Sequence, residues 1–183
     1  MQPHSLAPPA RYNATSIALH WLLAVAIVAN FSLGVYMHEL PISPWQLKLY
    51  NWHKWAGITI LAFSALRLLW RLLHPPPADV PMPPWQRRLA HAVHRALYGL
   101  FFAVPLAGWA YSSAAGFPVV VFGVLPLPDW VPVSPMLAKV LKGMHELLAS
   151  ALGLLVLLHV AAALKHHLVD RDGLLHRIRP MWR

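Results

Sequence analysis

The sequence predicts an all-α integral membrane protein, built as a four-helix bundle. Of its 183 residues, 58% are hydrophobic and only 11% are charged, and the mean hydropathy is +0.50. Several predominantly apolar runs reach about 20 residues, the length that a helix needs to cross the hydrocarbon core of a bilayer. Four such spans with short connections use nearly the whole chain, so we expect a single domain over residues 1–183.

The first span is predicted at residues 17–36, an uncharged run that carries His20 about one turn from its start. It is longer than the apolar core of a usual signal peptide, so we expect it to be retained. The connection at 37–52 contains Pro41 and Pro44, which favour turns.

The second span is predicted at residues 53–73 and opens with His53 between two tryptophans, a residue type typical of the membrane–water interface. Arg67 lies fourteen residues after His53, deep in the apolar run. Arg71, near the end of the span, is expected to extend its charge to the interface.

The third span is predicted at residues 95–115. It follows a proline-rich connection, HPPPADVPMPPWQRR, that cannot continue a helix. His91 and His94 lie on the approach to this span, three residues apart and therefore on one helix face. Pro105, inside the span, predicts a kink.

The fourth span, residues 143–165, follows an apolar segment at 116–135 that prolines and glycines interrupt. We expect that segment to form an interfacial cap over the bundle and not a fifth span. His145 and His159 bracket the centre of the fourth span at a spacing of fourteen residues. Fourteen residues make about four helical turns, so both imidazoles leave the same face, roughly 21 Å apart.

The distribution of basic residues predicts the topology. Eleven lysines and arginines fall in the two tails, the second connection and the adjoining helix ends, against four on the opposite face. Because these residues are enriched on the cytoplasmic side of membrane proteins, we expect both termini in the cytoplasm. We expect no nucleic-acid partner from the +9 net charge. The four residues on the opposite face are Lys48, Lys54, Lys139 and Lys142.

With this topology, four histidines form two pairs at two depths. His20 and His159 lie at the cytoplasmic depth, and His53 and His145 lie at the opposite, periplasmic depth. An ionisable side chain inside the membrane needs a partner, and a metal is the obvious partner for imidazole. A haem takes one axial ligand on each side of its plane, so we predict two bis-histidine haems. Both are b-type, because the chain has no cysteine for a thioether link.

An iron with two axial histidines has no open position for oxygen or substrate, so the pattern favours electron transfer across the membrane. Arg67, level with the cytoplasmic pair, is a candidate to bind a haem propionate, although arginines at such depths also extend toward the interface. Gly57 and Gly153 leave room for a macrocycle near the backbone, or for close helix packing.

The chain resembles the bacterial cytochrome b561 family over about residues 12–178, in the histidine pattern of IALHW, NWHKWAG, RLAHAVHRALYGLFFAVPLAGW and MHELLASALGLLVLLHVAAALKHH. That family is itself similar to the haem-b subunits of nickel–iron hydrogenases and formate dehydrogenases. The resemblance implies a multi-pass protein of the bacterial inner membrane with two haem b groups, ligated by His20–His159 and His53–His145. For a stand-alone member it implies superoxide oxidation coupled to ubiquinone reduction.

Three functions are compatible with this pattern. The favoured one is an oxidoreductase of the superoxide:ubiquinone type, in which His91 and His94 are candidates to bind the quinone carbonyl or relay its protons, unless they face lipid headgroups. The alternative is a haem-b anchor subunit that passes electrons from a partner hydrogenase or dehydrogenase to quinone. A metal-ion permease is the third, and it requires a polar pore that the first and fourth spans lack. Quinone, membrane lipids and a redox partner protein are the expected partners.

Overall fold

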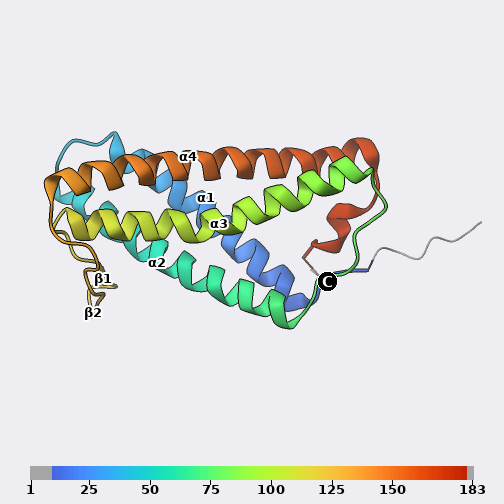
Figure 1. Ribbon diagram of the computed structural model, residues 1–183, viewed down its shortest axis with the longest axis horizontal. Coiled ribbons are helices and arrows are strands. Elements are labelled where there is room, and N and C mark those ends of the chain that lie inside the picture. The colour runs from blue at the N-terminus through green and yellow to red at the C-terminus, as the bar shows by residue number, and fades with distance from the viewer. Residues whose placement is uncertain (1–9, 181–183) are drawn as a thin grey trace, which may run out of the picture.

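The computed structural model describes residues 10–180, which form four long helices and a small β-hairpin (Figure 1). All four helices are long and apolar enough to cross a membrane. This confirms the predicted all-α membrane bundle. The helices are α1 (Ala14–His38), α2 (Pro44–Leu73), α3 (Pro84–Ala114) and α4 (Pro135–Lys165).

The helices begin earlier than the predicted spans, and prolines begin three of them. The hydroxyl oxygen of Ser43 accepts a hydrogen bond from the backbone nitrogen of Gln46 at 3.2 Å, and Pro44 is the first residue of α2. Ser134 caps α4 in the same way, ahead of Pro135. Proline suits the first helical turn, where its missing N–H has no intrahelical partner in any case. The prediction that Pro44 lies in a turn is therefore wrong.

The third helix runs through its internal proline, Pro105, without interruption. Figure 1 shows α3 changing direction near its middle, in agreement with the kink predicted from this residue. Its ends lie at opposite ends of the bundle, so α3 contributes side chains to both levels of the protein.

The predicted cap segment contains an antiparallel hairpin of β1 (Val120–Val121) and β2 (Leu125–Pro126). Two consecutive side chains of α2 hold it. Trp55 Nε1 donates to the Val120 carbonyl at 2.6 Å, and Lys54 Nζ donates to the Phe117 carbonyl at 3.2 Å. The hairpin therefore lies at the end of the bundle where α2 begins, the same end as the α1–α2 connection (Figure 1). We call this the hairpin end.

The first and last described segments, residues 10–12 and 177–179, meet at the opposite end, which we call the termini end. Arg177 is 6% exposed, and its guanidinium donates to the carbonyls of Ala10 at 2.9 Å and Ala78 at 2.8 Å. The backbone nitrogen of Tyr12 donates to the Arg177 carbonyl at 3.2 Å. The two tails and the α2–α3 connection are thereby joined. Arg183, one of the basic residues counted toward the topology, lies outside the described residues.

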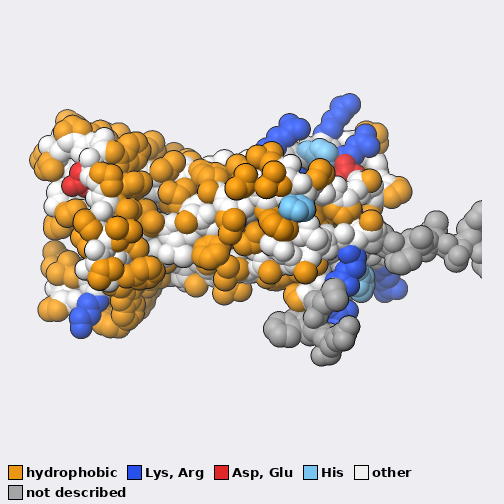
Figure 2. Space-filling view, turned by 90° about the horizontal axis from the view of Figure 1, so that it is seen from below, with side chains coloured by type: hydrophobic (Ala, Val, Ile, Leu, Met, Phe, Trp, Pro, Cys, Tyr) orange, Lys and Arg blue, Asp and Glu red, His pale blue; other side chains and the backbone are white. Residues whose placement is uncertain are grey.

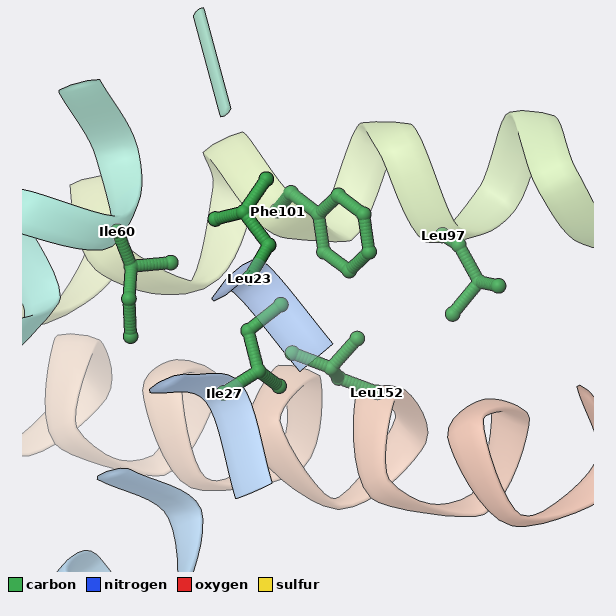
Figure 3. Packing of buried hydrophobic residues seen from close by; sticks show 6 residues of the cluster. All are labelled: Leu23, Ile27, Ile60, Leu97, Phe101 and Leu152. Carbon is green, nitrogen blue, oxygen red and sulfur yellow. The ribbon is translucent and has the colours of Figure 1, made fainter. Parts of the chain in front are cut away.

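The hydrophobic core lies midway along the bundle and draws on all four helices (Figure 3). Ile27, Ile60 and Leu152 each lie seven residues, about two helical turns, beyond a predicted haem ligand. The core therefore separates the two levels at which those histidines lie. Its buried members are Leu23, Ile27, Ile60, Leu97, Phe101 and Leu152.

Candidate functional site

The four predicted ligands lie as two facing pairs. The ring centroids of His53 on α2 and His145 on α4 are 6.1 Å apart, and those of His20 on α1 and His159 on α4 are 6.3 Å apart. A metal ion bound between two imidazole nitrogens, with bonds of about 2 Å, places the ring centroids roughly 6 Å apart. Both pairs have the separation that one six-coordinate iron requires. We call them the hairpin-end pair and the termini-end pair.

Backbone carbonyls orient both rings of the hairpin-end pair. Nδ1 of His53 lies 3.2 Å from the carbonyl oxygen of Asn30 on α1, and Nδ1 of His145 lies 3.0 Å from that of Val104 on α3. A ring nitrogen that bonds a carbonyl oxygen must carry the proton, so Nε2 of each neutral ring keeps its lone pair. Metal-binding histidines are commonly oriented through their other ring nitrogen in this way.

Two glycines that the sequence pattern did not single out make room for these rings. A Cβ atom on Gly34 of α1 would lie 3.0 Å from Cε1 of His53, and one on Gly108 of α3 would lie 3.0 Å from Cε1 of His145. Each ring therefore rests against bare backbone. Neither α1 nor α3 donates a ligand to this pair, so only the packing of the helices reveals these two positions.

The glycines that the sequence did single out have different neighbours. A Cβ atom on Gly153 of α4 would lie 3.1 Å from Cζ of Phe31 on α1, so this glycine serves helix packing. The nearest atom to the corresponding position on Gly57 is Nδ2 of Asn30, at 3.9 Å. Of the two alternatives left open for Gly153, packing is therefore the one that its contacts favour.

The termini-end pair has different surroundings. Nδ1 of His20 is buried and has no hydrogen-bond partner among the described residues. The ring of His94 on α3 meets that of His159 edge-on, with centroids 5.3 Å apart, so three imidazoles gather at this level. His91 does not share that environment: its Nε2 lies 3.0 Å from Oδ2 of Asp79, and both side chains are about half exposed.

The candidate propionate ligand, Arg67, also lies at the termini-end level, fourteen residues along α2 from His53. Its guanidinium carbon is 5.5 Å from the centre of the Tyr98 ring on α3. The side chain is partly buried, and no carboxylate within residues 10–180 forms an ion pair with it. Arg67 therefore offers a positive charge that the described chain does not neutralise.

Comparison with known proteins identifies the family. Residues 11–181 match the family model described as prokaryotic cytochrome b561. This chain is a member of the prokaryotic cytochrome b561 family. The predicted resemblance is thereby confirmed, and membership makes this a bacterial membrane protein of electron transfer that carries b-type haem.

Relatives match nearly the whole chain. It is 37% identical to cytochrome b561 homolog 2 of Escherichia coli (strain K12) over 172 residues, 93% of this chain and 92% of the relative. It is 34% identical to the probable superoxide oxidase CybB of Yersinia pestis over 173 residues, 93% and 96% of the two chains. It is 31% identical to cytochrome b561 homolog 1 of Escherichia coli (strain K12) over 172 residues, 93% and 97% of the two chains.

Both histidine pairs of this cytochrome b561 fit a haem. The ring separations suit an iron between them, and the hairpin-end rings keep Nε2 free of other partners through the bonds at Nδ1. The side chains of His20 and His159 face each other from α1 and α4, two helices whose backbones make few close contacts.

The lysines at the hairpin end differ in whether their ammonium groups are already paired or hydrogen-bonded. Lys54 is committed to the hairpin, as described above. Lys142 pairs with Glu146, one turn further along α4, at 3.7 Å, and both side chains are exposed. Lys48 and Lys139 are exposed and have no ion-pair partner within the described chain. They are the two cations at this end that can act on an approaching anion.

A separate group of potential metal ligands follows α4, where the helix continues as a π-helical turn (His166–Asp170). The ligand atoms of His166, Asp170 and Asp172 lie within 4.8 Å of one another. Nδ1 of His166 is 2.6 Å from Oδ2 of Asp172, and Nζ of Lys165 is 2.6 Å from Oδ2 of Asp170. Asp170 is paired with Lys165, and Asp172 is hydrogen-bonded to His166 and to the backbone nitrogen of Leu174, so we assign the group a structural role at the end of α4.

The polar surface of the protein is unevenly distributed. On the face seen in Figure 2, lysine and arginine side chains gather mainly toward the termini end, whereas hydrophobic side chains cover much of the middle and of the hairpin end. A surface with few charges over this length suits a bundle that crosses the hydrocarbon core.

Proposed function

We propose that this cytochrome b561 carries electrons across the bacterial inner membrane through two b-type haems, from superoxide on the periplasmic side to ubiquinone on the cytoplasmic side. The observation that supports the proposal most strongly is a facing histidine pair at each of two levels, about 21 Å apart along α4. When bound between such a pair, a haem would supply one-electron transfer.

The chain's own residues hold the haems in place. His53 and His145 would hold one haem through Nε2, because carbonyls of α1 and α3 keep the proton at Nδ1. His20 and His159 would hold the other. The hydrophobic core between the two levels fixes their separation and excludes water from the space between them.

The donor reaches the hairpin end. The excess of basic residues near the termini end favours a cytoplasmic location for both termini, which leaves the hairpin end in the periplasm. A relative described as a probable superoxide oxidase favours superoxide as the donor. Lys48 and Lys139 attract this small anion and raise its rate of encounter. Each superoxide gives up one electron and leaves as dioxygen.

Ubiquinone accepts the electrons at the termini end. Two electrons and two protons convert it to ubiquinol, so its site needs groups that carry protons close to the termini-end pair. His94, whose ring contacts that of His159, hydrogen-bonds the quinone carbonyl. His91 and Asp79 are exposed on the same side and relay protons from water.

The alternative function, a membrane anchor for a partner dehydrogenase or hydrogenase, has one observation in its favour. The hairpin and the segments beside it present large apolar side chains to the outside: Phe122 is 65% exposed and Val124 is 80% exposed. A partner subunit that covers this surface would deliver its electrons at the hairpin end. In that case the donor is a protein and not a small anion.

Haem quantification is the first test. A pyridine haemochrome assay on the purified protein should give two haem b groups per chain, and one or none in a folded preparation contradicts the proposal. Stopped-flow mixing with superoxide should then reduce the haems, at a rate that falls as salt rises, and added ubiquinone should reoxidise them. Haems that stay oxidised in superoxide would favour the anchor function.

The role of the lysines has a matched control. Replacing Lys48 and Lys139 together with glutamine should slow the reduction by superoxide several-fold at low salt, because the attraction is electrostatic. Replacing Arg87 and Arg88 together with glutamine removes the same charge from the termini end, and this variant should react at nearly the parental rate. Equal rates in both variants would remove the two lysines from the mechanism.

A further inference from the structure

Two arginines of α2 share one tyrosine ring of α3 at the termini end. The guanidinium carbons of Arg67 and Arg71 lie 5.5 Å and 5.7 Å from the centre of the Tyr98 ring. The two arginines are four residues apart, so they are neighbours on one helix face, where like charges repel. Neither forms an ion pair with an acidic residue of the described chain. An anion between them would relieve this repulsion.

The hydroxyl group of Tyr98 gives an independent indication of the same partner. Its oxygen is buried and has no hydrogen-bond partner within residues 10–180, while the rest of the side chain packs on the hydrophobic core. A buried hydroxyl group is normally hydrogen-bonded. A carboxylate offers acceptor positions for the hydroxyl and for both guanidiniums, and such charge-assisted bonds are among the strongest in proteins.

The three side chains lie close to the termini-end pair. Tyr98 follows His94 by one turn on α3, and the His94 ring is 5.3 Å from that of His159. The fourteen-residue spacing along α2 places Arg67 at the same level. Because the Tyr98 oxygen is buried within the bundle, an anion inside the protein suits it better than a lipid phosphate at the membrane surface.

We infer that Tyr98, Arg67 and Arg71 together bind a propionate carboxylate of the haem held by His20 and His159. The inference rests on the proposed function, because it needs a haem at that pair. It assigns Tyr98 and Arg71 to the site, and the exposed side chain of Arg71 would bind the carboxylate from the interface side, where the sequence places its charge. Two positive charges beside a haem favour its reduced form, so they raise the reduction potential of this haem relative to the other.

A redox titration of the purified, haem-loaded protein tests the inference. The termini-end wave is identified as the one that disappears in His20→Ala. Arg71→Gln should shift the reduction equilibrium of this haem about tenfold toward the oxidised form, equal to 59 mV for a one-electron couple. Tyr98→Phe should shift it in the same direction but less, because it removes a hydrogen bond and not a charge. Arg71→Lys should restore most of the potential.

Two control variants separate this assignment from general effects. Arg95→Gln removes a charge from an exposed position on α3, and Tyr111→Phe removes a hydroxyl at the other end of that helix; both should leave the termini-end wave in place. The hairpin-end wave serves as the internal standard for folding in every variant. Only a shift confined to the termini-end wave in Arg71→Gln and Tyr98→Phe supports the inference.

Three results would overturn it. If neither variant moves the termini-end wave, the arginines only stack on Tyr98. The second result concerns a lipid phosphate. The melting temperature of the parent protein is compared in phosphatidylglycerol-containing vesicles and in pure phosphatidylcholine vesicles. If Arg71→Gln removes a difference between the two but leaves the potential unchanged, the partner is a lipid phosphate. If the parent protein shows only one wave and one haem, the proposed function itself fails and this assignment fails with it.

Discussion

The two histidine pairs have nearly equal ring separations, 6.1 Å and 6.3 Å, but they are supported in different ways. At the hairpin end, backbone atoms orient the rings: two carbonyls bond the Nδ1 atoms, and two glycines leave space for the imidazoles. At the termini end, side chains surround the pair: a third imidazole contacts His159, and Nδ1 of His20 has no partner among the described residues.

This difference matches the chemistry proposed for each end. Backbone carbonyls cannot change their protonation state, so they fix the geometry of a ligand and exchange no protons. Guanidinium side chains carry a fixed positive charge that can adjust a haem, and imidazole side chains exchange protons, so they can assist a reaction that consumes protons. An end that only receives electrons needs rigidity, whereas an end that reduces a quinone needs proton carriers.

The largest effect is expected from removing one ligand of each pair. His145→Ala should lose the hairpin-end haem and keep the other, and His159→Ala should do the reverse, because each histidine lies at only one level of α4. Haem content should fall from two per chain to about one in each variant. Spectral redox titration identifies which haem remains, and loss of the same haem in both variants would contradict the pairing.

Filling the space that Gly108 leaves beside His145 should give the next largest effect. Gly108→Ala places a methyl group 3.0 Å from Cε1 of His145, so the ring must shift. That shift disturbs the hydrogen bond by which the Val104 carbonyl orients the ring. Overpacking of this kind costs about 1–3 kcal/mol. We expect weaker retention of the hairpin-end haem in detergent, measured by its loss during dialysis against apomyoglobin. Gly99→Ala on the same helix meets no atom within 4 Å and should retain both haems.

The tie between the tails should matter to stability but not to the haem ligands. Arg177→Ala leaves the carbonyls of Ala10 and Ala78 without their charged donor, at a cost of about 2 kcal/mol. The melting temperature in detergent should fall, whereas the exposed Arg95→Ala should leave it unchanged. If freshly prepared Arg177→Ala shows unaltered spectra of both haems, the loss of stability is confined to the tails. If this variant loses the hairpin-end haem first, the prediction is contradicted.

The smallest effect is expected at Glu146, which directly follows a predicted ligand. Its carboxylate pairs with Lys142 at the surface, and exposed pairs of this kind contribute less than about 1 kcal/mol. Glu146→Gln should therefore leave the hairpin-end spectrum and the melting temperature close to those of the parent protein. A shifted haem spectrum would show that this carboxylate reaches His145 in the loaded protein.

Much of the fold follows from local sequence. Long apolar runs predict membrane helices because burying backbone polar groups in lipid requires that they bond within the segment. The internal proline of α3 predicted its bend. Two helix starts lie earlier than predicted, because the sequence placed Pro44 in a turn and Ser134–Pro135 in the cap segment. In the structure, Ser43 and Ser134 each accept a hydrogen bond from the backbone nitrogen three residues further on, and the following proline begins the helix.

The sequence by itself determined which histidines share a level, because helical geometry converts a spacing of fourteen residues into a fixed distance along the bundle. Only the tertiary structure decided how each level is built. The contacts that build each level join different helices. They are the carbonyls that orient His53 and His145, the space that Gly34 and Gly108 leave for those rings, and the two arginines over one tyrosine. Contacts of this kind depend on the rotation of each helix about its axis. That rotation is set by packing against the neighbouring helices, and no local pattern of residues encodes it.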